Sequence, residues 1–403
     1  MAVMTLDDTA ARQAFFRQSI HNNLRYWQTW AENHLSHPAA LTTERDGIIR
    51  ALAFATKLES AWNLDYRLII QFSSFMERGG HWCEWESLLR HAIHSARQFG
   101  KIEDEAGLSA LLGLMLQRRQ KFSAAIAQHR YTIKIARQAG NTYALARSLT
   151  NLGYLYIRQG KWWRAEILCR YALPAFKAAE NPSGMAHTHN HLGVLYTETG
   201  DWDCARDHLQ RACSLWESIG DEHGLMRGTV NLSALAIWMA QPAAALAHLN
   251  RALALQQASG DRAERCTIFR NFAVAYRIAG NFAAAEEYAH RAADCFREQN
   301  DVSGSAQMWN TLGVLHAAMG NHAQAEDYLQ KALQAAQRLD DKKLQVLVLA
   351  DMVDFRLQRG QFDAAAALLE ALEAAVAAAY RHTTRRQHWN TKLAAFRRAL
   401  VAR

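Results

Sequence analysis

Proline, cysteine motifs and long apolar segments are scarce or missing in this chain of 403 residues. Only four prolines occur, and because an interior proline costs a helix about 3 kcal/mol, so low a number favours helical structure. The six cysteines form no C-x-x-C pair, and a chain of this length does not need disulfides, so we expect free, mostly buried thiols in a reducing cytoplasm. No apolar run approaches the roughly 18 residues of a membrane span. The first ten residues contain two aspartates and no apolar segment, which argues against a signal peptide.

Acidic residues are missing from one segment in particular, and this accounts for the charge of the whole chain. The formal net charge is +8 with a pI near 9.2, a balance that suggests an anionic partner such as nucleic acid. Residues 381–403, however, contain no Asp or Glu and carry +7 of this total. Residues 1–380 are therefore nearly neutral, and the pI of the whole chain says little about nucleic-acid binding.

Apolar side chains, in contrast, are plentiful. Half of the residues are hydrophobic, and 12 Trp, 12 Tyr and 15 Phe supply enough apolar surface for a core, which excludes disorder as the main state. Arg outnumbers Lys by 36 to 10, a bias typical of GC-rich bacterial genomes. At roughly 100–200 residues per domain, the chain has room for two or three globular domains or for one long repeat array.

The same residue types return every 40 residues over most of the chain. Six of the eight positions at multiples of 40 are glycine, and a mostly alanine column follows five residues later. The first column reads Gly80, Gln120, Gly160, Gly200, Ala240, Gly280, Gly320 and Gly360. The second reads Trp85, Ala125, Ala165, Ala205, Ala245, Ala285, Ala325 and Ala365. Because no insertion interrupts these columns, they predict one structural unit repeated along the chain.

Turn signals also fall midway between these positions. Gly100, Gly140, Gly220 and Gly260 hold four of the midpoints, and Asn or Asp follows most midpoints. Gly suits the left-handed residue that ends a helix, and Asn or Asp suits the N-cap of the next one. The segments of about 17 residues between these signals carry apolar residues at helical spacing. Each unit is therefore predicted to be two antiparallel helices joined by short turns.

In the first helix of each pair, a large apolar residue is followed by a small one. The large residues are Leu112, Leu152, Leu192, Leu232, Phe272, Leu312 and Met352. Gly113, Gly153, Gly193, Ser233, Ala273 and Gly313 follow them. Small side chains let the second helix approach closely. Since one pair cannot bury its apolar faces alone, neighbouring pairs are expected to stack.

This pattern resembles the tetratricopeptide repeat. The residues that carry the resemblance are Trp309, Leu312, Gly313, Gly320, Ala325, Tyr328 and Ala332 in one unit, and Leu152, Gly153, Tyr156, Gly160, Ala165 and Ala172 in another. The usual repeat has about 34 residues. The longer period of this chain is similar to the extended-helix subclass of kinesin light chains, bacterial peptide-receptor regulators and the sensor regions of STAND-type signalling ATPases. The period alone also allows HEAT or armadillo repeats, but the Gly and Ala columns favour tetratricopeptide repeats.

The resemblance implies an all-α fold, a right-handed α-solenoid of stacked antiparallel helix pairs. We expect residues 1–60 to form a helical N-terminal cap and residues 61–380 to form eight repeats of 40 residues. Residues 381–403 are expected to form a basic capping helix. Trp389, Leu393, Phe396 and Leu400 recur there at helical spacing, as in an amphipathic helix that covers an open solenoid end.

The resemblance also implies a binding groove, because the first helix of each pair lines the concave face of tetratricopeptide solenoids. The column that precedes the large apolar residue reads Asn151, His191, Asn231, Asn271, Thr311 and Asp351. In the family, Asn in this column often binds the backbone of an extended peptide, and a carboxamide can both donate and accept hydrogen bonds. The alternative is that these amides bond within their own turns or to a neighbour.

Other polar and aromatic residues belong to the same expected face. Arg beside amides and rings suits an acidic or carboxylate-bearing peptide, whereas a solvated face with internal ion pairs is the alternative. The candidate peptide-binding residues are Arg147, Asn151, Tyr154, Arg158, His187, Asn190, His191, Arg227, Asn231, Trp238, Arg270, Asn271, Arg277 and Asn310.

Recognisable catalytic, metal and nucleotide motifs are missing. His187 and His191 are spaced to share a helix face that could hold Zn²⁺, but no third ligand can be named. The motif G-x-x-x-x-G-K-[ST] does not occur, so no P-loop for ATP is expected. We therefore predict no metal, no cofactor and no enzymatic activity.

These patterns together predict a cytoplasmic scaffold or sensor that binds a protein or peptide in a bacterial signalling or defence system, without a membrane partner. One alternative is a transcriptional or enzyme regulator controlled by the groove ligand. Another is nucleic-acid binding through the basic C-terminal helix, although that helix lacks a recognised DNA-reading motif.

Overall fold

The computed structural model describes residues 6–34, 38–78, 81–259, 262–380 and 384–401. Gly80 and Gly260 of the turn columns, and Arg381 and Arg403 of the basic C-terminal segment, lie outside these ranges. By compactness the chain forms two units, residues 1–184 and residues 185–403. The boundary between the units thus falls inside the repeat array that the sequence predicts, not at one of its ends.

Helices account for all the regular structure of the described residues, which confirms the all-α prediction. In unit 1 the helices are α1 (Leu6–His34), α2 (Pro38–Ala55), the short 3-10 helix η1 (Glu59–Ala61), α3 (Trp62–Arg78), α4 (Trp82–Gln98), α5 (Ile102–Arg118), α6 (Phe122–Ala139), α7 (Thr142–Arg158) and α8 (Trp162–Ala178). The helix α9 (Pro182–Thr199) spans the unit boundary. It is followed in unit 2 by α10 (Trp202–Ser218), α11 (Glu222–Trp238), α12 (Pro242–Ser259), α13 (Arg262–Ile278), α14 (Phe282–Glu298), α15 (Val302–Ala318), α16 (His322–Arg338), α17 (Lys342–Gln358), α18 (Phe362–Ala379) and α19 (Thr384–Val401).

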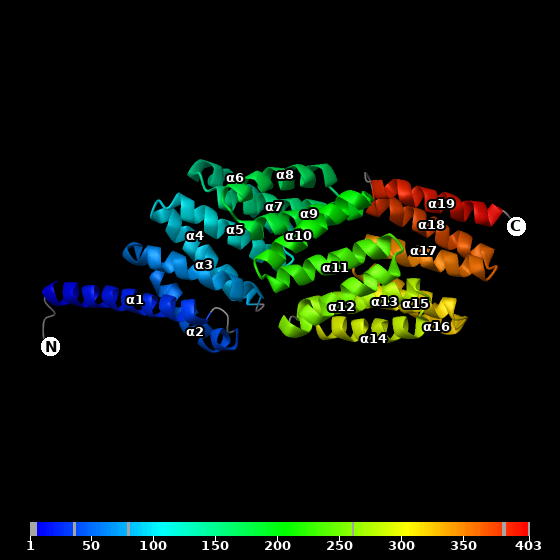
Figure 1. The fold of residues 1–403 in the computed structure, drawn as a ribbon, viewed down its shortest axis with the longest axis horizontal. Helices are drawn as coiled ribbons and strands as arrows, with labels where there is room; N and C mark the ends of the chain where they lie inside the picture. Colours follow the sequence, from blue (N-terminus) through cyan, green and yellow to red (C-terminus); the bar gives the residue numbers. More distant parts are fainter. Residues whose placement is uncertain (1–5, 35–37, 79–80, 260–261, 381–383, 402–403) are drawn as a thin grey trace. The chain divides into compact units, whose positions relative to one another are not determined.

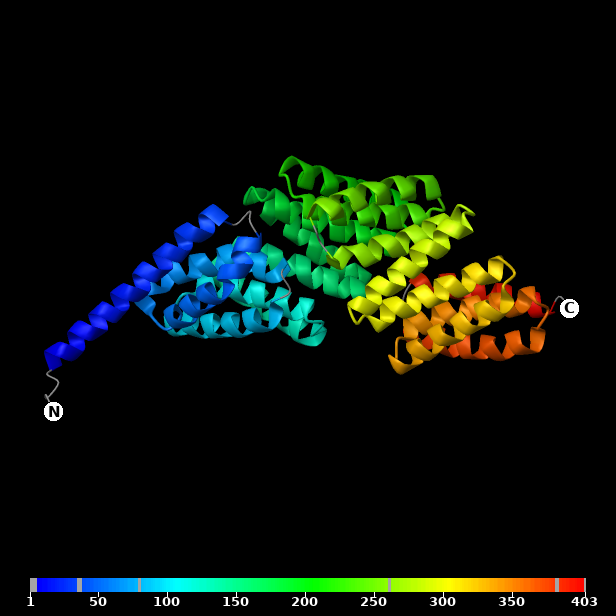
Figure 2. The same cartoon turned by 90° about the horizontal axis from the view of Figure 1, so that it is seen from below.

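From α3 to α18 the helices pack in consecutive antiparallel pairs (Figure 1 and Figure 2). We call the first helix of each pair the A helix and the second the B helix. In unit 2 the A helices contact one another in series, α11 with α13, α13 with α15 and α15 with α17. Among the described residues, the principal contacts include no pair of successive B helices. The A helices therefore form the inner layer of each stack and the B helices the outer layer.

The turn residues adopt the conformations that the sequence predicts. Gly160 has a φ of 71°, in the left-handed region, and Gln120 and Ala240 take the same conformation in the two pairs that lack the glycine. At the midpoints, Asn141 and Asp301 each accept a hydrogen bond at 2.9 Å from the backbone N–H three residues later. These side chains are the expected N-caps.

The small-residue columns lie where two helices meet. Every alanine of the column from Ala125 to Ala365 is 0% exposed. A Cβ added at Gly193 would lie 2.5 Å from Leu209 Cγ, and one at Gly313 would lie 2.7 Å from Leu329 Cγ. The predicted close approach of the B helix to the A helix is therefore confirmed.

The last helix, α19, packs against α17 and α18. Its Trp389, Leu393 and Phe396 are 5–7% exposed and belong to one apolar cluster with residues of both helices. Lys392 Nζ lies 3.5 Å from Asp354 Oδ2 in α17. A second ion pair, between Arg397 and Glu373 in α18, is 2.7 Å long. Two of the cations of this basic helix are thus paired within the solenoid. No helix in the described ranges combines the length and the apolar character that a membrane crossing requires.

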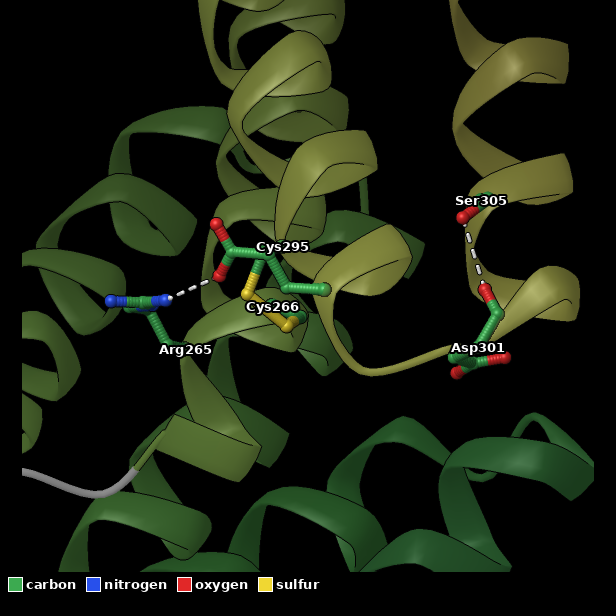
Figure 3. The surroundings of a disulfide bond; sticks show 6 residues. Arg265, Cys266, Cys295, Asp301 and Ser305 are labelled. Carbon is green, nitrogen blue, oxygen red and sulfur yellow. Dashed lines mark hydrogen bonds and ion pairs between the residues drawn. A yellow bond between two sulfur atoms is a disulfide. The ribbon is translucent and has the colours of Figure 1, made fainter.

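The expectation of free cysteines is wrong for one pair. Cys266 and Cys295 form a disulfide that joins the N-terminal part of α13 to the last turn of α14 (Figure 3). Both residues are buried, at 0% and 3% exposure. The same two repeat positions hold buried alanines in the next pair, Ala306 and Ala335. The disulfide therefore forms because the 40-residue register places two cysteines at neighbouring positions of one hairpin.

Reducing this disulfide is expected to lower the free energy of unfolding by about 3–4 kcal/mol, because the bond closes a loop across 29 residues. Urea unfolding with and without dithiothreitol measures the difference. The variant Cys266→Ala with Cys295→Ala copies the alanine pair of the next hairpin and should be insensitive to the reductant. An unfolding midpoint of the wild-type chain that does not move on reduction would contradict this expectation.

Candidate functional site

The candidate site is the set of polar side chains along the A helices of unit 2, some exposed and some buried. On α9, α11, α15 and α17 it includes side chains spaced by three or four residues, which share one side of a helix, and on α13 it includes the neighbours Arg270 and Asn271. We call the following set the inner face: His187, Asn190, His191, Arg227, Asn231, Arg270, Asn271, Gln307, Asn310, Asp351 and Asp354.

Hydrogen bonds between successive A helices hold the amide column in place. Asn231 Nδ2 donates to Asn190 Oδ1 at 2.8 Å, which links α11 to α9. Asn271 Nδ2 donates to Ser233 Oγ at 3.2 Å, which links α13 to α11. These amides thus bond to a neighbour, one of the two alternatives that the sequence left open. A carboxamide has two N–H donors and two acceptor positions, so one such bond does not use its whole capacity.

Arginines of the inner face differ in how their charge is balanced. Arg227 Nε lies 4.0 Å from Glu264 Oε1. Arg270 Nη1 donates instead to the amide oxygen of Gln307 at 3.2 Å. Burial lowers the pKa of Arg270, and the nearby charges of Glu264 and Asp301 oppose that shift. Across the described part of the chain, no carboxylate lies within ion-pair distance of Arg270.

A carboxylate cluster lies further along the same face. Asn310 Nδ2 donates to Asp351 Oδ2 at 2.7 Å. Burial raises the pKa of Asp351, while the Asn310 hydrogen bond and the charges of Lys392 and Arg277 lower it and Asp354 raises it further. The inner face therefore carries both signs of charge, with the basic character around α11 and α13 and the acidic character on α17.

The histidines of α9 contact side chains of α10. His187 packs edge-on against Trp216, with ring centroids 5.2 Å apart. His189 Nδ1 lies 2.8 Å from His208 Nδ1, and burial together with the charge of His208 lowers the pKa of His189 to about 4. His191 is 6% exposed. A search of the described residues finds no group of three or more His, Cys, Asp or Glu that could hold a metal ion.

Four of the fourteen candidate residues belong to unit 1. Arg147, Asn151, Tyr154 and Arg158 all lie on α7. The guanidinium of Arg158 lies over the Phe122 ring, 4.5 Å from its centroid. Within one compact unit, the structure therefore brings together the ten candidates from α9 to α15 and not these four.

The sequence indicated the candidate residues but not the side chains that contact them. Ser233, Glu264 and Trp216 contact inner-face side chains but were not singled out as binding residues. A signal for Ser233 exists, because it is the one hydroxyl among the six small residues from Gly113 to Gly313 in this column. Trp238, at the end of α11, is 53% exposed, as a ligand-facing aromatic side chain requires.

Stacked antiparallel helix pairs, with left-handed turns and buried alanine columns, define the protein as an α-solenoid of helical hairpins. Two family models, both described as "Tetratricopeptide repeat", match this chain, one over residues 304–377 and the other over residues 185–219 and 265–298. These three segments of the chain are tetratricopeptide repeats. A search of curated proteins finds no relative by sequence.

Solved structures share the fold at low sequence identity. A Rap protein complexed with Competence and Sporulation Factor is 14% identical, with a TM-score of 0.61, and the match covers 84% of this chain and 97% of that one. A STAND protein with a tetratricopeptide repeat sensor from Pyrococcus horikoshii is 15% identical with a TM-score of 0.59, covering 82% of this chain and 50% of that one. The Rap conjugation gene regulator of plasmid pLS20, in complex with the Phr* peptide, is 12% identical with a TM-score of 0.55, covering 80% and 96%. At these identities the likeness shows the fold alone.

Proposed function

We propose that this protein is a peptide-binding scaffold whose inner face receives an extended segment that carries at least one carboxylate. The surroundings of Arg270 give this proposal its strongest support. In the other repeats its position holds Ile70, Ala110, Thr150, Asn190, Val230, Asn310 and Ala350, none of them charged. A half-buried guanidinium with an amide partner and no ion pair is an incomplete arrangement. A ligand carboxylate would complete it with a bidentate, charge-assisted pair.

The amides beside Arg270 suit the backbone of such a ligand. Asn231 and Asn271 follow one another on adjacent A helices, and each is held by a hydrogen bond to its neighbour. Fixed amides lose little side-chain entropy when they bind a peptide unit. They therefore suit recognition of an extended chain of any sequence, while Arg270 supplies the preference for acidic residues.

The fold supports the same proposal by analogy. One structural neighbour is complexed with Competence and Sporulation Factor, and another with the Phr* peptide. The stacked A helices of a tetratricopeptide array provide a long surface for such ligands. We place the scaffold in a bacterial signalling system, where ligand binding would control a partner protein, and we propose no catalytic step for it.

Two variants test the proposal. Arg270→Leu should weaken binding of fluorescein-labelled acidic peptides at least about tenfold, because a charge-assisted hydrogen bond contributes roughly 1.5–3 kcal/mol. Neutral peptides of the same length should be affected much less. Asn231→Ala combined with Asn271→Ala should weaken the binding of acidic and neutral peptides equally, because these amides would bind backbone groups. Fluorescence anisotropy measures each affinity.

The control is Arg338→Leu, which removes an exposed arginine at the end of the B helix α16 and should leave every affinity unchanged. Thermal melting followed by circular dichroism checks that each variant is folded. Acidic peptides that bind Arg270→Leu and the wild-type chain equally well would overturn the role of Arg270. Unchanged affinity in the double asparagine variant would overturn the inner face as the binding surface.

A further inference from the structure

The outer side of α8 carries large apolar side chains in contact with solvent. Trp163 is 70% exposed and Tyr171 is 71% exposed. Ile167 is half-buried and Pro174 is exposed, and the four positions follow one another at intervals of three or four residues. They therefore form a stripe along one side of the helix. We call these four residues the α8 patch.

Three other B helices carry charged residues on the same side. In three of the seven other B helices, α10, α14 and α16, the positions of Ile167 and Tyr171 hold an acid and a base four residues apart, a pair that stabilises a solvated helix face. Ion pairs join Asp207 to Arg211 in α10 at 3.0 Å, Glu287 to Arg291 in α14 at 3.4 Å, and Asp327 to Lys331 in α16 at 2.6 Å. The position of Trp163 holds Asp203, Ala243, Ala283 and Ala323 in the next four pairs. At the repeat positions where α10, α14 and α16 carry ion pairs, α8 therefore carries apolar side chains.

Cations flank the α8 patch. Lys161, Arg164 and Lys177 are exposed, while Arg170 pairs with Glu166 at 2.8 Å. The helix and its N-cap thus carry four basic residues and one acidic residue. A second copy of this chain would place like charges against one another, whereas a partner with Asp and Glu beside its apolar residues would complement them.

We propose that the α8 patch is a docking surface for an acidic amphipathic helix of a partner protein. The apolar side of that helix would cover Trp163, Ile167 and Tyr171. Its carboxylates would pair with Arg164 and Lys177 at the edges. Exposed aromatic anchors with a charged rim are typical of interface hot spots. This surface lies on a B helix and is separate from the inner face, so a ligand and a partner can be bound by different helices of the solenoid.

Two synthetic amphipathic peptides test the proposal, one with glutamates and the other with lysines beside the same stripe of leucine and phenylalanine. The acidic peptide should bind the wild-type chain at least about tenfold more tightly than the basic one. The variant Ile167→Asp with Tyr171→Arg, which installs the ion pair found in α10, should lose that binding at least about tenfold and keep the thermal midpoint of the wild-type chain. Trp163→Ala should weaken binding without any new charge.

Three controls separate this surface from the others. Asp327→Asn with Lys331→Gln removes the equivalent ion pair in α16 and should leave binding unchanged. Arg270→Leu should also leave it unchanged, which distinguishes the α8 patch from the inner face. Equal affinity for the two peptides, or acidic binding that survives in both α8 variants, would overturn the proposal. Sedimentation that shows self-association of the wild-type chain, abolished by the α8 variants, would replace the partner by a second copy and overturn it as well.

Discussion

Replacing Asp65 by asparagine is expected to make the protein more stable at pH 8 and to flatten its stability between about pH 4 and pH 8. Asp65 lies in the first turn of α3, is 0% exposed, and neither carboxyl oxygen has a hydrogen-bond partner among the described residues. Burial raises the pKa of this carboxyl from 3.8 to about 8. The folded protein therefore keeps a proton that the unfolded chain has already released.

The direction in which the free energy of unfolding changes with pH follows from this difference in bound protons. As the pH rises through the interval between the two pKa values, unfolding releases a proton, so each added pH unit favours the unfolded chain. The loss by pH 8 is on the order of 5 kcal/mol. The carboxamide of the Asp65→Asn variant would not titrate, so the difference in free energy of unfolding between variant and wild type should grow from pH 4 to pH 8. Urea unfolding at several pH values measures it.

Glu105 is the matched control, because it occupies the same repeat position one unit later. It is also buried, but it is paired with Arg97 at 2.5 Å and with the Tyr131 hydroxyl at 2.5 Å. Removing the charge there breaks two charge-assisted bonds, so Glu105→Gln should destabilise the protein at neutral pH by roughly 1–3 kcal/mol. If Asp65→Asn also destabilises at pH 8, the account of Asp65 as an unpaired buried carboxyl is wrong.

Replacing His129 by leucine is expected to protect the protein against acid. His129 is 0% exposed, and neither ring nitrogen has a hydrogen-bond partner in the described structure. Burial, with a smaller contribution from the charge of Arg147, lowers its pKa from 6.5 to about 3. Below pH 6.5 this histidine is therefore protonated in the unfolded chain but stays neutral in the folded protein. Stability falls as the pH drops through this interval, by on the order of 4–5 kcal/mol at pH 3.

Leucine is the natural occupant of this position in the solenoid. His129 lies against Gly113, just as Leu209 lies against Gly193 in a later pair. His129→Leu should therefore fit without a clash, hold its stability from pH 6.5 to pH 4, and exceed the wild type most at the acid end. His91→Leu, at an exposed position of α4, is the control for the substitution itself. Parallel pH profiles of the wild type and His129→Leu would contradict this account.

The fold was predictable because its signal is repeated. Each alanine of the Ala125 to Ala365 column had six companions at the same position, so the burial of all of them followed from one packing rule. Left-handed turns at Gln120 and Ala240 followed from the register even where the residue type was unsuitable.

Pairwise contacts were harder to predict, because they depend on the register between repeats. The Asn231–Asn190 bond joins residues 41 positions apart, and the Asn271–Ser233 bond joins residues 38 apart. A column of similar residues does not indicate which neighbouring side chain each amide will form a hydrogen bond with. The disulfide was missed for a similar reason: Cys266 and Cys295 belong to two different columns, and only their comparison with Ala306 and Ala335 shows that those columns touch. The exposed side of α8 was missed because its large apolar residues do not recur together at the same positions of any other repeat, so no repeat column shows them.

Photo-crosslinking with an acidic peptide is the most direct test of the central claim, that the inner face of unit 2 is a peptide-binding surface. A benzophenone in the middle of the peptide reacts with whatever side chain it touches, and mass spectrometry identifies the adduct. The account predicts adducts on the A helices α11, α13 and α15, close to Arg270, and their loss in Arg270→Leu. Adducts that fall on the B helices or on α19, or that persist equally in Arg270→Leu, would contradict it.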